Sequence, residues 1–192
     1  MNILWLNSRI MFPLDQGGRI RTYHTLKHLS REHHIAVVTL AVLPGEATSI
    51  PAMTRVCREL HVVATRPPAP RGSLRFAARL AANLVSRRPY SVTRYRSRRM
   101  RRKVASLLRE GLSGGAVDVV VCDFLTPAIN LPPTVKVPVV LFAHNVEAVI
   151  WDRLAETTTQ RMRQAYFRLQ ARRMARMAVS YTHLRAHETK AN

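Results

Sequence analysis

The sequence predicts an alternating α/β fold in which helices cover both faces of a parallel sheet. Short apolar runs rich in β-branched residues alternate with longer segments whose apolar residues recur every three or four positions. The links are short, and the apolar runs are nearly continuous instead of alternating with polar residues. Such strands are typical of a parallel sheet buried on both faces, so we expect the first half of a doubly wound fold.

Each element follows from its local pattern. Strands are predicted at residues 2–7, 35–41, 60–64, 117–122 and 137–143. Helices are predicted at residues 19–32, 50–59, 73–86, 96–112, 147–155 and 160–177, with a short helix or turn at 126–131. Residues 66–72, RPPAPRG, form a linker or exposed loop because of their prolines.

Length and composition limit the possibilities. With 192 residues and 47% apolar content, the chain suffices for one α/β domain and is too short for two full ones. Cys57 and Cys122 have no metal-ligand spacing, which favours reduced core thiols of a cytosolic protein. No apolar run is long enough to span a bilayer, and the N-terminus lacks the pattern of a signal peptide. We expect a cytoplasmic protein.

The charge is strongly positive, at +20, with 31 Lys and Arg against 11 Asp and Glu. Such a field favours anionic partners, although arginine richness can also reflect a GC-rich genome. Residues 66–109 hold fourteen Lys and Arg and no acidic residue. Three interpretations fit this basic segment: contact with the inner face of the plasma membrane, nucleic-acid binding, or a basic face that is merely solvated. Nucleic-acid binding is the least favoured, because the segment has few aromatic residues for stacking. The candidate membrane or anion contacts are Arg75, Arg79, Arg98, Arg99 and Arg102, beside a predicted apolar helix face of Leu74, Ala77, Leu80, Ala81 and Leu84.

Gly17 and Gly18 lie between the first strand and the first helix, at the carboxyl edge where open α/β sheets bind ligands. Glycines let the backbone approach a ligand closely, and a helix N-terminus attracts anions. The pair matches neither GxGxxG nor a P-loop. A tight strand-to-helix turn explains it equally well.

Polar residues also follow two later strands at the same edge. His144, Asn145 and Glu147 come after the fifth strand, where an imidazole can donate to a sugar hydroxyl or stabilise charge on a phosphate. Asn145 and Glu147 also suit the start of a helix. Asp123 ends the fourth strand and either binds acceptor hydroxyls or caps the next turn. His144 is the predicted catalytic residue; no metal site is predicted.

Two stretches resemble a known enzyme family. The opening, MNILWLN and then FPLDQGGRIRTYHTLKHLSREHHIAVVTL, resembles the start of glycosyltransferase family 4, also called the group 1 glycosyltransferases. The later stretch AHNVEAVIWDRLAETT, continuing to RLQARRMARM, is similar to the His-Asn-x-Glu segment and following helices of that family. The resemblance covers about residues 1–177.

This resemblance implies a GT-B fold, in which two Rossmann-like domains face each other across a cleft. Residues 1–177 would form the N-terminal, acceptor-side domain. The second domain would bind the nucleotide-sugar donor, and the sugar would pass with retention, without a metal or other cofactor, to a cell-envelope, lipid-linked or polysaccharide acceptor. Gly17 and Gly18 would approach the donor phosphates or the sugar, and His144 would contact the sugar near the reacting centre.

The sequence departs from the family in one respect. It holds no counterpart of the glutamate pair that the family carries in its donor domain, so the activity is expected of a longer parent protein and not of these 192 residues alone. From Val179 the sequence VSYTHLRAHETKAN shows no period and resembles a recurrent tail of translated metagenomic contigs. We therefore expect residues 178–192 to be a disordered or artefactual tail.

Two alternatives remain. A nucleotide-sugar epimerase with a GT-B fold shares this architecture, and only a donor domain would distinguish it. A non-catalytic basic module that binds an anionic membrane or nucleic acid is the alternative from another class.

Overall fold

The structure is a computed structural model that describes residues 1–143 and 147–183. The chain divides into two compact units. Met1–Pro67 and Tyr95–Phe142 form the sheet unit, and Pro68–Arg94 with the described residues from Ala143 onward forms the helical unit.

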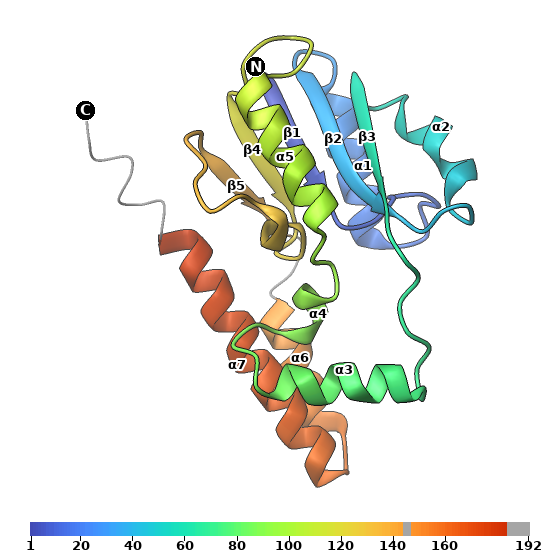
Figure 1. The fold of residues 1–192 in the computed structure, drawn as a ribbon, viewed down its shortest axis with the longest axis vertical. Helices are drawn as coiled ribbons and strands as arrows, with labels where there is room; N and C mark the ends of the chain where they lie inside the picture. The colour runs from blue at the N-terminus through green and yellow to red at the C-terminus, as the bar shows by residue number, and fades with distance from the viewer. Residues whose placement is uncertain (144–146, 184–192) are drawn as a thin grey trace. The chain divides into compact units, whose positions relative to one another are not determined.

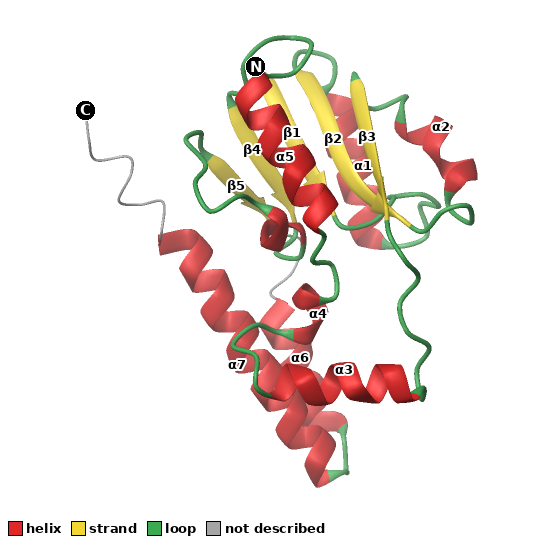
Figure 2. Cartoon of the chain, in the orientation of Figure 1, coloured by secondary structure: helices red, strands yellow, loops and turns green. Residues whose placement is uncertain are grey.

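The sheet unit contains a five-stranded, fully parallel sheet in the order β3-β2-β1-β4-β5 (Figure 2). Its strands are β1 (Asn2–Asn7), β2 (His34–Ala41), β3 (Glu59–Ala64), β4 (Val119–Asp123) and β5 (Val139–Phe142). The five predicted strands are confirmed, with small shifts at their ends. The predicted strand at 137–143 is too long, because Pro138 has no N–H group for a sheet hydrogen bond.

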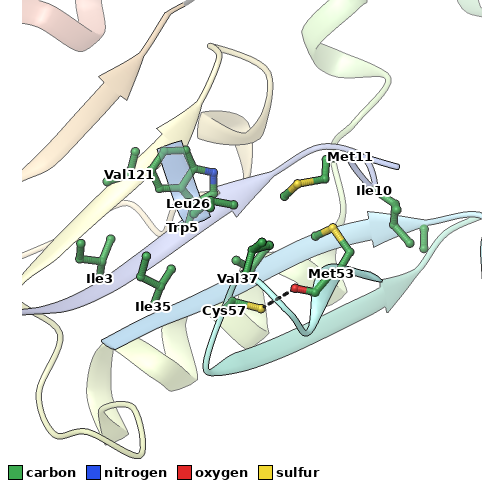
Figure 3. Close-up of a cluster of buried hydrophobic side chains, with 12 residues drawn as sticks. Ile3, Trp5, Ile10, Met11, Leu26, Ile35, Val37, Met53, Cys57 and Val121 are labelled. Carbon is green, nitrogen blue, oxygen red and sulfur yellow. Dashed lines mark hydrogen bonds between the residues drawn. The ribbon is translucent and has the colours of Figure 1, made fainter. Parts of the chain in front are cut away.

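Helices cover both faces of this sheet, which confirms the predicted α/β, Rossmann-like class. Helix α1 (Gly17–Leu29) lies behind the strands and α5 (Arg98–Glu110) in front of them (Figure 1). Alternate residues of the central strands point to opposite faces. On one face, Trp5 and Val37 pack with Leu26 of α1 in a buried apolar cluster (Figure 3). On α5, the buried residues are Met100, Val104 and Leu107.

Both cysteines are free and buried, as predicted for core thiols. In the cluster of Figure 3, the Cys57 thiol donates a hydrogen bond to the Met53 carbonyl oxygen at 3.3 Å. Burial, together with the negative charge of Glu59, raises the pKa of Cys57 to about 11. Since the thiolate is the reactive form, this cysteine is protected from thiol reagents at neutral pH.

The predicted helix at 50–59 is wrong over most of its length. A short 3₁₀ turn, η1 (Ala47–Ser49), leads into α2 (Ile50–Met53), which has only four residues. The chain then leaves the helix because its backbone pairs with the sheet: the Arg58 N–H donates to the Ile35 carbonyl at 2.9 Å, and β3 begins at the next residue. Pairing with a neighbouring strand therefore overrides the local helical pattern.

Other helix ends also differ from prediction, and two of the differences involve glycines. Helix α1 begins at Gly17, so the two glycines form its first turn instead of the preceding loop. Helix α5 ends at Glu110, and Gly111 follows with a φ of +88°. A Cβ at Gly111 would lie 2.9 Å from the Gly115 carbonyl oxygen, so this turn requires glycine. The predicted turn at 126–131 is the 3₁₀ helix η2 (Pro127–Asn130).

The helical unit contains α3 (Leu74–Leu84), α4 (Tyr90–Thr93), α6 (Glu147–Thr157) and α7 (Arg161–His183). Helices α6 and α7 pack together through Trp151 and Phe167, whose ring centroids lie 5.8 Å apart. The prediction that the pattern ends at Met177 is wrong for the helix, because α7 continues through residues 178–183. The rest of the predicted tail lies outside the described residues.

The predicted apolar face of α3 is the exposed face. Leu74 is 91% and Leu84 is 53% exposed, whereas Asn83 is buried and Phe76 is half-buried. Phe76 packs edge-on against Tyr90, with ring centroids 6.1 Å apart. An aromatic ring and a hydrogen-bonded amide therefore occupy the inner side. Leu74, Leu84 and the alanines face outward, whereas Leu80 is half-buried.

Polar side chains from α7 hold the carboxyl end of α3. Arg173 is 7% exposed and donates to the carbonyl oxygens of Asn83 at 2.8 Å and of Leu84 at 2.7 Å. The fully buried Gln170 donates to the Asn83 side-chain oxygen at 3.1 Å and accepts from the Tyr90 N–H at 2.8 Å. The cation at the end of a helix is stabilised by the partial negative charge there.

Candidate functional site

The carboxyl edge of the sheet contains a topological switch point between β1 and β4. From β1 the chain proceeds outward to β2 and β3, and it then returns to add β4 and β5 on the opposite side of β1. The segments that follow β1 and β4 consequently lead away in different directions. Ligands of open α/β sheets bind in the crevice outside such a point.

Gly17 and Gly18 lie at this edge, in the first turn of α1. Gly17 is exposed, and a Cβ built on it would meet no atom within 4 Å. The Gln16 side chain makes no capping hydrogen bond, and the first turn has no acidic residue. The first N–H groups of α1 therefore have no side-chain cap, and a helix N-terminus of this kind can bind an anion.

An ion pair holds the loop before α1. Arg19 donates to Asp15 at 2.9 Å and to the Pro13 carbonyl oxygen at 3.1 Å. The Arg19 side chain is only 20% exposed, although Asp15 is half exposed. These bonds fix the loop against the first turn of the helix and thereby keep Gly17 in place.

Several polar residues at the switch point were missed by sequence reasoning. Ser8, which follows β1, donates a hydrogen bond to the Thr126 hydroxyl after β4 at 3.0 Å. Arg9 lies over the Tyr95 ring at 5.7 Å from its centroid. Phe124 has a φ of +69°, a costly conformation for a residue with a side chain. The position of Asn7, Ser8 and Arg9 directly after the first strand was the signal that could have identified them.

Asp123 is at the same edge but is 2% exposed. Its carboxylate accepts a hydrogen bond from the buried Thr22 hydroxyl of α1 at 2.9 Å. The bond links the end of β4 to the helix that carries Gly17 and Gly18. This position gives Asp123 a clear role in placing α1, whereas its contact with an acceptor remains a prediction.

The other predicted substrate-site residues belong to the helical unit or lie outside the described part. His144 and Asn145 are not among the described residues. Glu147 is the first residue of α6, which agrees with the helix-start interpretation of its position. Its role in substrate binding remains a prediction.

A second polar cluster joins the amino ends of β2 and β3. His34 Nε2 lies 2.7 Å from Glu59 Oε1, and the Ser113 hydroxyl lies 2.7 Å from the same oxygen. Ser113 Oγ is also 3.2 Å from His34 Nε2. A catalytic triad uses one imidazole nitrogen for the nucleophile and the other for the carboxylate, whereas here one nitrogen faces both. The cluster is therefore a structural hydrogen-bond network at the edge opposite to the switch point.

The stabilisation that this hydrogen-bond network provides depends on the ionisation of Glu59. Partial burial by itself raises the pKa of Glu59, but hydrogen bonds from Ser113 and His34 and the charge of His34 outweigh it, and the pKa falls from 4.5 to about 2. A lowered pKa stabilises the fold above the unfolded value of 4.5, and this stabilisation is lost as the pH falls toward 2.

Glu59→Gln should therefore lower the free energy of unfolding at neutral pH, and the difference from wild type should shrink as the pH falls from 4.5 toward 2. Urea unfolding followed by circular dichroism over a pH series measures it. Glu32→Gln, at an exposed position, is the control and should show no such convergence. A pH-independent difference for Glu59→Gln would contradict the electrostatic explanation.

Taken together, the fold and this edge define an α/β protein with a Rossmann-like parallel sheet. Comparisons of the chain with protein-family models, curated proteins and solved structures found no match. Across residues 1–143 and 147–183, no group of three or more His, Cys, Asp or Glu is arranged to hold a metal ion. No helix in that part of the chain is long and apolar enough to cross a membrane.

Proposed function

We propose that this chain is the acceptor-side domain of a retaining glycosyltransferase of family 4, which transfers a sugar from a nucleotide-sugar donor to a cell-envelope, lipid-linked or polysaccharide acceptor. The observation that carries the proposal is the open first turn of α1 at the switch point. Gly17 leaves space where a side chain would stand, and the uncapped N–H groups suit a donor phosphate. The sequence resemblance supplies the reaction class.

The predicted site residues have distinct parts in this proposal. The backbone of Gly17 and Gly18 approaches the donor phosphates, and the Asp123–Thr22 bond fixes the helix that presents them. His144 donates to the transferred sugar near the reacting centre. Asn145 and Glu147 contribute to substrate binding. The donor nucleotide itself binds a second domain that these residues do not include, so the chain alone is inactive in this proposal.

The test begins with the native gene downstream of the codon for Met177. A frame that continues into a second α/β domain with the family's glutamate pair supports the proposal, and its full-length product should transfer sugar from a panel of nucleotide-sugar donors. A product that interconverts the free nucleotide-sugars without an acceptor would identify an epimerase instead. A gene that stops at Asn192 would contradict the glycosyltransferase.

In the full-length protein, His144→Ala should lower kcat for transfer by about tenfold or more, because one donor to the transition state is lost. Steady-state rates with a saturating donor measure this. His24→Ala, on the exposed surface of α1, is the matched control and should retain wild-type rates. Near wild-type turnover in His144→Ala would exclude the catalytic role.

A further inference from the structure

One face of α3 is apolar and exposed along the whole helix. At 100° per residue, the exposed apolar positions span one continuous arc of the helix, and Val85, the C-cap residue, extends it. Leu74 is 91%, Leu84 is 53% and Val85 is 90% exposed. The alanines between them, Ala77, Ala78, Ala81 and Ala82, are exposed as well. Single exposed apolar residues are ordinary, but a continuous stripe of them marks a contact surface.

The opposite side of α3 is firmly held. Arg173 and Gln170 bind its carboxyl end, and Phe76 packs against Tyr90. At the amino end, the Ser73 hydroxyl accepts a hydrogen bond from the Phe76 N–H at 3.2 Å. The helix is thus fixed from one side, so the apolar stripe cannot turn inward without breaking these bonds.

Arginines border the stripe. On the helix surface Arg75 and Arg79 lie between the exposed apolar arc and the buried side, and both are exposed. Arg71 precedes the helix, and Arg87 and Arg88 follow it, all exposed. Apolar residues bordered by arginines form the pattern of a helix that lies in the plane of a membrane interface, with arginines at the headgroups.

The basic helix α5 differs in this respect. Its arginines Arg98, Arg99 and Arg102 are exposed, but its apolar residues Met100, Val104 and Leu107 are buried in the sheet unit. It has charge without an exposed apolar stripe. Compared with α5, α3 combines exposed arginines with an exposed apolar stripe.

We propose that α3 docks the protein on an anionic lipid bilayer, with Leu74, Leu84 and Val85 entering the interface and Arg75 and Arg79 contacting lipid phosphates. Charge complementarity selects this occupant: a second copy of a chain with a net charge of +20 would be repelled. Nucleic acid would gain nothing from a stripe of leucine, valine and alanine that lacks aromatic rings for stacking. Membrane docking through α3 goes beyond the proposed function. Its test measures lipid binding alone, so the result does not depend on sugar transfer.

Vesicle co-sedimentation of the 192-residue chain tests the apolar stripe. Binding to vesicles that contain phosphatidylglycerol should exceed binding to pure phosphatidylcholine vesicles by about tenfold or more. The double variant Leu74→Ser/Val85→Ser should lose about tenfold or more of the binding to anionic vesicles. Met162→Ser is the matched control, because Met162 is 88% exposed on α7, and it should bind as wild type does.

Two double variants test which arginines contact the lipid phosphates. Arg75→Gln/Arg79→Gln should weaken binding to anionic vesicles more than Arg98→Gln/Arg102→Gln does, although each removes two charges. Equal losses in the two pairs, or wild-type binding by Leu74→Ser/Val85→Ser, would overturn docking through α3. The proposal would also be overturned if the wild-type chain binds no vesicles and Leu74→Ser/Val85→Ser instead loses self-association or duplex DNA binding.

A thiol dye reports insertion directly. Because Cys57 and Cys122 are buried, an environment-sensitive dye should label an introduced Leu74→Cys selectively. Its emission should shift to the blue on adding phosphatidylglycerol vesicles, and a dye at Met162→Cys should not shift. No shift at position 74 while the protein sediments with the vesicles would place the contact elsewhere and refute the proposal.

Discussion

Arg173→Leu is expected to lower the free energy of unfolding by about 2–4 kcal/mol. Arg173 is 7% exposed and supplies donors to the Asn83 and Leu84 carbonyl oxygens at the end of α3. Leucine would leave these oxygens without that donor and would remove a cation from the negative end of the helix. Urea unfolding followed by far-UV circular dichroism measures the change.

Arg172→Leu is the matched control, since it removes the same charge from the neighbouring, exposed position of α7. It should change the unfolding free energy by about 0.5 kcal/mol or less. The double variant Arg173→Leu/Asn83→Ala should cost less than the sum of its two single changes, because the residues share hydrogen bonds. If Arg172→Leu and Arg173→Leu lower the free energy of unfolding equally, the buried hydrogen bonds of Arg173 do not contribute to stability.

Much of the sheet unit could be predicted because its signals are local. Between Asn2 and Asn7 the strand is apolar, as expected of a strand covered on both faces, and its predicted ends agree with β1. The helix predicted at 50–59 failed for a non-local reason. Backbone pairing between Arg58 and Ile35 begins β3 there, and no short stretch of sequence contains that partner.

The helical unit shows what periodicity cannot supply. The alternation in residues 73–86 revealed an amphipathic helix but not which side the protein covers. Its inner side includes Asn83, which is buried because Gln170 and Arg173, roughly ninety residues later, satisfy its polar atoms. The sequence alone does not distinguish the buried Arg173 from the exposed Arg172 beside it. Long-range hydrogen bonds determine which side of α3 is buried, and the local sequence does not contain them.

The candidate edge was predicted in outline. Placing Gly17, Gly18 and Asp123 at the carboxyl edge required only strand order and direction, and the topology confirms that placement. The bond between Asp123 and Thr22 joins residues 101 positions apart, so it could not be anticipated. The strained backbone of Phe124 had no sequence signal, since phenylalanine rarely adopts a positive φ.

Gly17→Leu is expected to lower kcat/KM for sugar transfer about a hundredfold in the full-length protein, because a side chain at the open first turn of α1 would displace the donor phosphates by an ångström or more. Folding should be preserved. Gly17 does not have a positive φ, and its Cβ would meet no atom within 4 Å. Gly17→Ala should therefore be as stable as wild type or slightly more stable, and its activity should be intermediate.

Gly45→Ala provides the control for removing a glycine, since its Cβ would make only an ordinary contact, 3.7 Å from the Val42 carbonyl oxygen. It should leave transfer unchanged. Thermal unfolding and steady-state kinetics on the same preparations separate the two explanations of Gly17. If Gly17→Leu unfolds at the wild-type temperature and is inactive, the space above the first turn belongs to a ligand. If it is both stable and fully active, the glycine serves only the first turn of α1, and the donor phosphates must bind elsewhere.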